Sequence, residues 1–248
     1  MTAAILIPAR YGSTRFPGKP LALISGVTLI ERVYRRATLS TRALAVFVAT
    51  DDERIDAHVQ SFGGRSVVTE GTFDTGTDRI AAALATIEKD GERFDYVVNL
   101  QGDEPLIDIS SVDRLIDALE SGDDPIVTLA CPIETESEFN SPDVVKVVTD
   151  LTGRALYFSR SPVPHSGSSS ARRHVGIYGF QRDALLSITR LPQSDLERLE
   201  RLEQLRALEN GYKIRVLYTA APHLGVDRFE DIRRVEDELA RSQPVPES

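Results

Sequence analysis

The chain has 248 residues, of which 41% are hydrophobic and 27% charged, a composition typical of a globular protein rather than a disordered or fibrous one. The formal net charge of −9 excludes binding to nucleic acid or anionic membranes through a broad basic face, but it permits a small basic pocket for an anionic ligand. Cys131 is the single cysteine, which excludes an intramolecular disulfide and a zinc site built on several thiolates.

The first half of the chain alternates short apolar runs with helical patterns. Helices are predicted from the capping-box pattern Thr28-x-x-Glu31 to about residue 37, from 51 or 52 to the glycines at 63 and 64, and over 77–87. This alternation indicates βαβ units, right-handed crossovers and a mostly parallel sheet. The predicted strands are rich in Val and Ile and cover 3–8, 43–50, 65–69 and 96–100.

The second half loosens this alternation. Its strand-like runs lie too close together for a helix in every gap, and they cover 126–131, 144–149, 155–159 and 175–180. Segment 161–173 is rich in Pro, Gly and Ser, which predicts a mobile loop.

The C-terminal region begins with a second capping-box pattern, Ser194-x-x-Glu197. It predicts one helix that carries a stripe of leucines at 196, 199, 202, 205 and 208 and ends at Gly211. A strand over 213–219, an amphipathic helix over 229–241 and a frayed tail over 242–248 follow. With no internal repeat and no linker, residues 1–248 are predicted to form one α/β domain with a mixed portion around 126–190.

No apolar run approaches the roughly 20 residues that span a bilayer. The apolar stretch at 1–8 is shorter than a secretory signal and precedes its first cation, Arg10. We therefore expect a cytoplasmic protein.

The most informative segment is PARYGSTRFPGKP at 8–20, which directly follows the first predicted strand. Arg10, Arg15 and Lys19 bring three cations to the carboxyl end of that strand, where open α/β sheets bind ligands. Cations and glycine backbone suit phosphate oxygens, so a nucleoside triphosphate fits. The segment is not a P-loop, because five residues separate Gly12 from Gly18 and Pro20 stands where Ser or Thr would bind magnesium. The alternative is a solvated basic turn.

Carboxylates supply further candidates. Asp103 follows the strand at 96–100, where it suits either Mg²⁺ beside phosphates or a simple Asx turn. Asp227 lies three residues before Glu230, and local sequence favours a helix cap there. Asp74 and Asp78 are interpreted as helix-start residues, although Arg79 beside them has the chemistry to face a ligand.

Polar residues in the second half have ordinary structural interpretations as well. His174 follows Arg172 and Arg173, and the three together offer cations to an anionic substrate, although a single histidine is more often structural. Glu203 and Gln204 lie in the predicted leucine-rich helix, where polar residues usually form a solvated face.

Taken in order, these motifs resemble the 3-deoxy-manno-octulosonate (Kdo) cytidylyltransferases, also called CMP-Kdo synthetases. The first motif alone also suits other sugar nucleotidyltransferases, whereas the later ones narrow the resemblance to Kdo-type enzymes. The matching segments span nearly the whole chain: PARYGSTRFPGKPL at 8–21, ATDD at 49–52, TGTDR at 75–79, NLQGDEP at 99–105, ALYFSR at 155–160, HVGIY at 174–178, LEQLR at 202–206 and GVD at 225–227.

The resemblance implies a nucleotide-diphospho-sugar transferase (Rossmann-like) fold, a homodimer, and a Mg²⁺-dependent reaction of CTP with Kdo that gives CMP-Kdo and pyrophosphate for lipopolysaccharide biosynthesis. It implies that Arg10, Arg15 and Lys19 hold the triphosphate, and that Asp103 and Asp227 bind Mg²⁺. Arg10, Lys19, Asp103 and Asp227 are thereby implied as the catalytic residues. The cytidine would contact Ala9, Ser13, Thr75, Gly76, Arg79 and Gln101, and the sugar would contact Arg160, His174, Tyr178, Glu203 and Gln204.

Two alternatives remain open at this point. One is a cytidylyltransferase for another acidic sugar, such as 8-amino-Kdo or a sialic acid. The other is a regulator on the same fold that binds CTP without releasing pyrophosphate, and the presence of both Asp103 and Asp227 argues against it.

Overall fold

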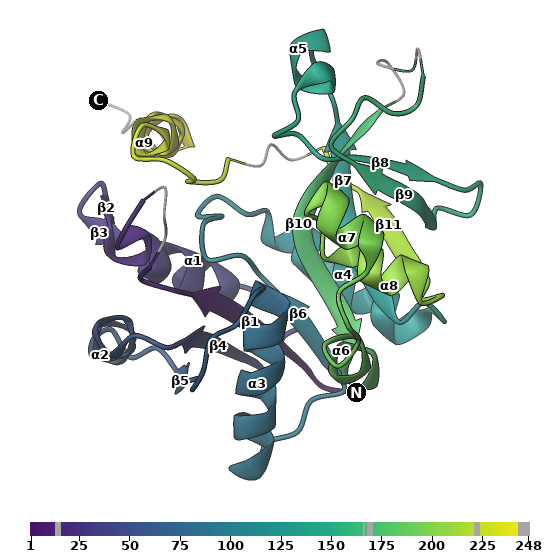
Figure 1. Ribbon diagram of the computed structural model, residues 1–248. Coiled ribbons are helices and arrows are strands. Elements are labelled where there is room, and N and C mark those ends of the chain that lie inside the picture. Colours follow the sequence, from purple (N-terminus) through teal and green to yellow (C-terminus); the bar gives the residue numbers. More distant parts are fainter. Residues whose placement is uncertain (13–15, 166, 168–170, 221–223, 243–248) are drawn as a thin grey trace.

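The computed structural model describes residues 1–12, 16–165, 167, 171–220 and 224–242. Within this part of the chain, a mixed sheet runs through the molecule in the order β11-β7-β10-β6-β1-β4-β5, with helices against both faces (Figure 1). Six strands of this path point the same way, and the long strand β10 (Arg172–Gln181) runs antiparallel between β6 and β7. The mostly parallel α/β fold predicted from the sequence is confirmed.

The strands joined in parallel are short. The inner ones are buried on both faces, as their apolar sequences predicted, whereas the two edge strands are only partly buried. Their bounds are β1 (Ala3–Ala9), β4 (Ala45–Thr50), β5 (Ser66–Val68), β6 (Tyr96–Asn99), β7 (Ile126–Pro132) and β11 (Ile214–Tyr218). Strands β8 (Lys146–Thr149) and β9 (Ala155–Ser159) form an antiparallel hairpin that joins the sheet where β8 pairs with β10. A small hairpin of β2 (Leu23–Ile24) and β3 (Val27–Thr28) stands apart.

Alternate residues of each strand enter two separate hydrophobic cores, because successive side chains of a strand point to opposite faces. Ile5 and Ile7 pack with α1 (Leu29–Ala37), α2 (Glu53–Ser61), α4 (Ile109–Ser121) and α9 (Asp231–Ser242) on one face. Leu6 and Val97 pack with α3 (Gly76–Lys89), α6 (Arg182–Ile188) and α8 (Gln204–Glu209) on the other. The remaining described helices are η1 (Lys19–Leu21), α5 (Glu136–Asn140) and α7 (Asp195–Glu200).

The helix predicted from Ser194 to Gly211 is wrong in one respect. Ser194 and Glu197 do form the predicted capping box, but the chain then breaks into α7 and α8. The break is at Arg201, which adopts a left-handed conformation with φ 55° and ψ 48°. Leu199 of the predicted stripe is 79% exposed. The break turns Glu203 and Gln204 toward the protein interior. In the predicted continuous helix, both residues would lie on a solvated face.

Other differences are local. Helices α4, α5 and α6 and the β2–β3 hairpin were not predicted, and the strand predicted from 175 already begins at Arg172. Much of the predicted frayed tail, residues 243–248, and residues 166 and 168–170 of the predicted mobile loop lie outside the described residues. Among the described helices, none is long and apolar enough to cross a membrane. The assignment of residues 1–248 to one domain stays a prediction.

Candidate active site

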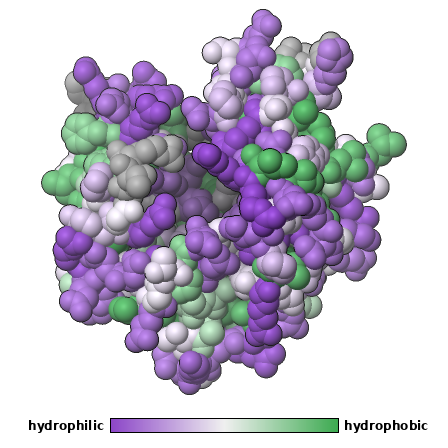
Figure 2. All heavy atoms as spheres, viewed as in Figure 1, coloured by the Kyte–Doolittle hydropathy of each residue, from purple (hydrophilic) through white to green (hydrophobic). Residues whose placement is uncertain are grey.

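A polar cavity of about 220 Å³ opens beside the carboxyl ends of β1 and β6. Figure 2 shows the surface hollowed between the side that carries α1 and β2 and the side that carries β8 and β9, with mostly hydrophilic side chains around the hollow. Ser13 and Arg15, two predicted nucleotide contacts, lie outside the described residues. The lining residues are Pro8, Ala9, Arg10, Lys19, Pro20, Phe73, Asp74, Thr75, Gly76, Arg79, Gln101, Gly102, Asp103 and Asp227.

The loop after β1 is closed on itself before it reaches Lys19. The amide of Gly18 donates to the carbonyl oxygen of Tyr11 at 2.9 Å, and Gly18 has φ 71°, a conformation that L side chains rarely adopt. The guanidinium carbon of Arg54 lies 3.3 Å from the centre of the Tyr11 ring, which braces the loop from outside. The closed loop delivers Arg10 and Lys19 to the same cavity.

Lys19 connects three distant parts of the chain. Its Nζ donates to Asp103 Oδ2 at 2.8 Å and to the carbonyl oxygen of Val226 at 2.9 Å, and it lies 3.9 Å from Asp227 Oδ1. One ammonium group therefore holds two carboxylates close together.

The helix cap favoured for Asp227 by local sequence is wrong. Helix α9 begins four residues later, at Asp231, whose carboxylate accepts the amide protons of Asp227 at 2.9 Å and Arg228 at 2.8 Å. The side chain of Asp227 is 58% exposed and lines the cavity. Its carboxylate is thus accessible to a ligand in the cavity.

Close backbone approach shapes the other side of this cavity. A Cβ on Gly102 would lie 2.9 Å from the carbonyl oxygen of Pro8, so only glycine fits between β1 and the turn that carries Asp103. Thr75 caps α3, because its hydroxyl accepts the amide proton of Asp78 at 3.1 Å. The N-terminus of α3 therefore meets the cavity, where unpaired amides favour a polar or anionic ligand.

Arg79 contributes as a braced cation. Its Nη2 donates to Asp51 Oδ2 at 2.8 Å and its Nη1 to Thr69 Oγ1 at 3.0 Å. The guanidinium is buried and packs at 5.1 Å from the ring centre of Phe73, which also lines the cavity. Arg79 thereby forms part of the wall of the site.

A second cavity of about 670 Å³ adjoins the first, since Gln101 and Asp227 line both. It contains every residue that the resemblance assigns to the sugar. Its lining is Gln101, Glu104, Asp143, Val144, Val145, Arg160, Arg173, His174, Gly176, Tyr178, Arg201, Leu202, Glu203, Gln204, Leu224, Gly225, Asp227, Asp231 and Arg234.

His174 and Tyr178 face this second cavity together, with ring centres 5.3 Å apart, although the pairing of β10 with β7 is irregular between Val175 and Tyr178. Thr128 Oγ1 lies 2.7 Å from the carbonyl oxygen of Ile177 and 3.0 Å from His174 Nε2. The threonine hydroxyl has one proton, which we assign to the nearer acceptor, the Ile177 carbonyl; Nε2 is then assigned as the protonated ring nitrogen of His174. Nδ1 is then an acceptor.

The interpretation of residues 172–174 as three adjacent cations is wrong. Burial lowers the pKa of His174 from 6.5 to about 3, so its ring is neutral at pH 7. Arg172 packs its guanidinium 5.5 Å from the Tyr218 ring centre, whereas Arg173 lines the second cavity. Because successive side chains of a strand point to opposite faces, Arg172 and Arg173 lie on opposite faces of β10.

The same pKa shift predicts a pH-dependent stability. Below pH 6.5 the unfolded chain binds a proton at His174 that the folded protein does not bind until the pH reaches about 3. Acidification across this window should therefore lower the free energy of unfolding by up to about 1.4 kcal/mol per pH unit at this residue. Urea titrations of wild type and His174→Gln at several pH values measure it; parallel pH profiles for the two proteins would contradict the prediction.

Two buried polar groups of the second cavity have no hydrogen-bond partner among the described residues. They are the Tyr178 hydroxyl and the Gln204 Nε2 amino group. Tyr178 is 4% exposed and Gln204 is 7% exposed. Such groups are rare in folded proteins because an unsatisfied buried group costs about 1–3 kcal/mol. A ligand with hydroxyl groups would satisfy both.

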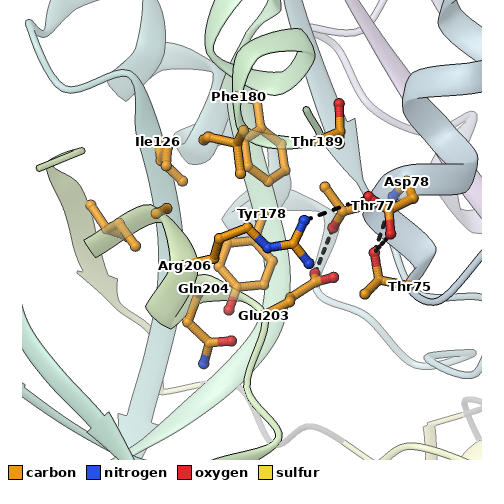
Figure 3. Close-up of a pocket in the computed structure, with 13 residues that line it drawn as sticks. Thr75, Thr77, Asp78, Ile126, Tyr178, Phe180, Thr189, Glu203, Gln204 and Arg206 are labelled. Carbon is orange, nitrogen blue, oxygen red and sulfur yellow. Dashed lines mark hydrogen bonds and ion pairs between the residues drawn. The ribbon is translucent and has the colours of Figure 1, made fainter. Parts of the chain in front are cut away.

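Glu203 lines the second cavity and contacts helix α3, whose first residue lines the first cavity. Its Oε1 accepts from Thr77 Oγ1 at 2.5 Å, and Figure 3 shows Glu203, Thr77 and Arg206 pointing toward one another. Burial raises the pKa of the Glu203 carboxyl, even though hydrogen bonds from Thr77 and Thr75 favour its ionised form. The solvated helix face expected for Glu203 and Gln204 is therefore wrong.

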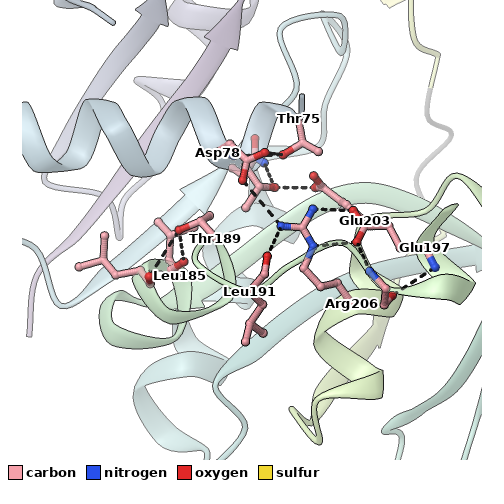
Figure 4. Close-up of polar contacts among 12 residues, drawn as sticks. Thr75, Asp78, Leu185, Thr189, Leu191, Glu197, Glu203 and Arg206 are labelled. Atoms are coloured by element: carbon pink, nitrogen blue, oxygen red, sulfur yellow. Dashed lines mark hydrogen bonds and ion pairs between the residues drawn. The ribbon is translucent and has the colours of Figure 1, made fainter. Parts of the chain in front are cut away.

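Arg206, next to Gln204 and Leu205 on α8, links this helix to its neighbours. Its guanidinium makes a buried two-point contact with the Glu197 carboxylate, at 2.7 Å from Nε and 2.5 Å from Nη2, and lies 4.0 Å from Asp78. Figure 4 shows Arg206 between these carboxylates, joining α8 to α7 and to the start of α3. Arg206 thus packs α8 against α7 and close to the start of α3.

Several lining residues were not singled out as site residues by the sequence. Arg201 lacked any signal because the sequence predicted it inside a continuous helix, and Phe73 lacked one because an isolated aromatic residue suggests core. Arg173 was visible only as part of a basic run. These three extend the site beyond the segments of the resemblance.

The carboxylates fit magnesium better than a metal held by a cage of protein ligands. In the described ranges no cluster of three or more His, Cys, Asp and Glu side chains is placed to hold an ion. Asp103 and Asp227 nevertheless converge on one cationic group, the Lys19 ammonium. Magnesium usually binds through one or two carboxylates together with substrate phosphates, so this donor set fits it.

Comparison with known proteins agrees with this geometry. Residues 4–214 match the family model described as cytidylyltransferase. The chain is 47% identical to a protein of Thermodesulfovibrio yellowstonii named 3-deoxy-manno-octulosonate cytidylyltransferase, over 95% of this chain and 97% of the relative. It is 46% identical to a protein of Shewanella halifaxensis named 8-amino-3,8-dideoxy-manno-octulosonate cytidylyltransferase, over 97% and 99%.

A solved structure is similar over almost the whole chain. It is described as CMP:2-keto-3-deoxy-manno-octonic acid synthetase complexed with CTP. The TM-score is 0.90 at 40% sequence identity, with 98% of this chain and 100% of the other covered. The similarity therefore extends to the fold of nearly the whole chain.

Proposed function

The chain belongs to the cytidylyltransferase family, among the 3-deoxy-manno-octulosonate cytidylyltransferases, and we propose that it transfers a cytidylyl group from CTP to Kdo, giving CMP-Kdo and pyrophosphate. The observation that carries this proposal is the pair of adjoining cavities that share Gln101 and Asp227. One cavity has the cations and carboxylates that a triphosphate needs, and the other has the buried polar groups that a sugar acid needs. The product would serve lipopolysaccharide biosynthesis.

The nucleotide would lie in the first cavity. Arg10 and Lys19 would contact the triphosphate, and Arg15, outside the described residues, would join them. The cytidine would contact Ala9, Ser13, Thr75, Gly76, Arg79 and Gln101. Backbone amides at the start of α3 and the Arg79 side chain, which is held by Asp51, would provide part of these contacts.

The sugar would lie in the second cavity. Arg160 and Arg173 would supply positive charge for its carboxylate, and His174 Nδ1 would accept a hydrogen bond from a sugar hydroxyl. Tyr178, Glu203 and Gln204 would take further hydroxyl groups. Because the cavities adjoin, a sugar bound in this way would meet the nucleotide beside Gln101 and Asp227.

The reaction follows from this arrangement. The anomeric hydroxyl of Kdo attacks the α-phosphorus of CTP, a new phosphorus–oxygen bond forms, the bond to the β-phosphate bridge breaks, and the hydroxyl proton is released. Arg10 and Lys19 stabilise charge on the phosphate oxygens, which needs no covalent intermediate with the enzyme. Asp103 and Asp227 would hold Mg²⁺, which when bound supplies further neutralisation of that charge.

The sugar remains to be distinguished from 8-amino-Kdo, because relatives at similar identity carry that name. We favour Kdo, the sugar named for the Thermodesulfovibrio yellowstonii relative that is 47% identical to this chain. Pyrophosphate release measured with CTP, Mg²⁺ and either Kdo, 8-amino-Kdo or a sialic acid decides between them. We expect kcat/KM to be highest with Kdo; a higher value with another sugar would replace the assignment, and no release with any sugar would reject it.

Replacing His174 tests the sugar assignment separately. His174→Ala removes a hydrogen-bond acceptor and one side of the aromatic contact with Tyr178. The KM for Kdo should rise about 10-fold while the KM for CTP changes little, since one hydrogen bond with its packing is worth about 1.4 kcal/mol. Steady-state kinetics with each substrate varied in turn measures both constants. Equal increases would show that His174 does not act on the sugar.

We also propose a homodimer, as the family resemblance implies, and a cytoplasmic location. Leu151 at the tip of the β8–β9 hairpin is 108% exposed and Leu156 on β9 is 63% exposed, and a partner subunit would cover them. Sedimentation velocity at micromolar concentration measures the mass, and a monomer of 27.3 kDa would contradict the dimer. Fractionation of cells tests the location.

A further inference from the structure

The Arg160 side chain, at the edge of the second cavity, is fixed by hydrogen bonds to backbone oxygens. It follows β9 directly and lines the second cavity. Its guanidinium donates from Nε to the backbone oxygen of Glu200 at 2.8 Å and from Nη1 to that of Pro142 at 3.0 Å. As far as the described residues go, the Nη2 amino group keeps both of its protons for a ligand.

The backbone of Arg160 is held on both sides by charged groups. Its amide donates to Glu200 Oε2 at 2.8 Å, and its carbonyl oxygen accepts from Lys146 Nζ at 2.6 Å. Glu200 is the last residue of α7, and Lys146 is the first residue of β8. Helix α7 and strand β8, whose contacting residues are more than 50 positions apart in the chain, therefore both hydrogen-bond to the backbone of Arg160.

Lys146 is fully buried, and its ammonium group is fully hydrogen-bonded to the backbone. The residue is 0% exposed, and its ammonium donates to three backbone carbonyls, those of Ser141, Val144 and Arg160, at 2.6–2.9 Å. A buried charge is tolerated only when its protons are all used, and here each finds a carbonyl. The ammonium thereby ties loop 141–144 and the segment after β9 together.

Glu200 completes the support from the other side. Its second oxygen, Oε1, accepts from Ser159 Oγ at 2.8 Å and lies 3.4 Å from the Tyr157 hydroxyl. Proximity of the Glu200 carboxylate adds to burial in raising the pKa of the Tyr157 phenol, so Tyr157 stays a proton donor. The whole edge of β9 is thus anchored to the end of α7.

We propose that Glu200 and Lys146 are positioning residues that hold Arg160 in the orientation in which it receives the acidic sugar. The proposal rests on the proposed function in taking Arg160 as a sugar contact. A free arginine side chain loses about 2 kcal/mol of rotamer entropy when it is immobilised, and prior anchoring removes part of that loss at binding. Glu200 and Lys146 thereby act on sugar affinity without touching the sugar.

The kinetic test uses Glu200→Gln, which keeps the shape of the side chain but weakens its hydrogen bonds. We expect the KM for Kdo to rise about 5- to 10-fold with the KM for CTP unchanged. In an Arg160→Ala background the same substitution should have no further effect on the KM for Kdo, because the residue through which it acts is gone. Glu209→Gln, an exposed glutamate on α8, is the matched control and should leave every constant at its wild-type value.

The structural readout does not depend on the sugar. Amide hydrogen exchange at Arg160, followed by NMR, should be faster in Glu200→Gln and in Lys146→Met than in wild type; if Lys146→Met does not fold, Glu200→Gln alone decides. Unchanged protection at Arg160, or an equal rise in the KM for Kdo with and without Arg160, overturns the proposal. If wild type releases no pyrophosphate with any acidic sugar, the proposed function fails, and the exchange measurement still decides whether Glu200 and Lys146 hold Arg160.

Discussion

Asp227→Asn should lower the rate of pyrophosphate release on the order of 100-fold while the protein stays folded and thermally stable. Asp227 lies 3.9 Å from the Lys19 ammonium, beside Asp103, and lines both cavities. The substitution removes a negative charge where Mg²⁺ and the triphosphate would meet. Loss of one electrostatic stabiliser of a transition state costs about 3 kcal/mol, which corresponds to this factor in rate.

Stability should change little because the Asp227 carboxylate is 58% exposed and the backbone contacts of this segment belong to Asp231. Glu230→Gln removes the same charge three residues away, from an exposed side chain outside both cavities, and serves as the control. Thermal melting and pyrophosphate release are measured on the same samples across a range of Mg²⁺ concentrations. Wild-type turnover of Asp227→Asn at ordinary Mg²⁺ would refute the metal role.

Lys19→Ala is the second large effect, and it should appear in the use of CTP. The ammonium is held in place by Asp103 and the Val226 carbonyl, so it is already oriented when a triphosphate arrives. A hydrogen bond between charged groups is worth about 1.5–3 kcal/mol, so the KM for CTP should rise roughly 10- to 100-fold. Folding should be affected much less, because the residue adds little to either hydrophobic core.

Initial rates over a wide range of CTP concentrations measure this effect, with circular dichroism to verify folding. Lys89→Ala is the control, since Lys89 is an exposed residue at the far end of α3. It removes one positive charge without reaching either cavity. An unchanged dependence on CTP in folded Lys19→Ala would mean that the loop after β1 does not bind the triphosphate.

Much of the fold and part of the site followed from local patterns. Short Val- and Ile-rich runs separated by helices predicted β1, β4 and β6, and parallel strands bring their carboxyl ends to one edge. Arg10 after β1 and Gln101 and Asp103 after β6 therefore meet as a direct consequence of topology. The N-cap at Thr28 and the capping box at Ser194 were predicted correctly for the same reason, since hydrogen bonds within four residues are local.

The rest depended on contacts between distant segments. The sequence around Arg201 has no signal for a left-handed backbone conformation. The break between α7 and α8, which turns Glu203 inward, was therefore not predicted. Asp227 obtains its position from α9 packing and from Lys19, more than 200 residues earlier, whereas its neighbours in sequence suggested a cap. The neutral state of His174 likewise follows from burial among Phe158, Tyr178 and Thr128, which come from three strands.

The most direct test of the proposed activity is a ³¹P NMR time course of the wild-type protein with CTP, Mg²⁺ and Kdo. The account predicts that the three CTP resonances disappear together while a phosphodiester resonance of CMP-Kdo and a pyrophosphate resonance appear in equal molar amounts. Persistence of CTP, or its conversion to CDP and inorganic phosphate, would contradict cytidylyl transfer.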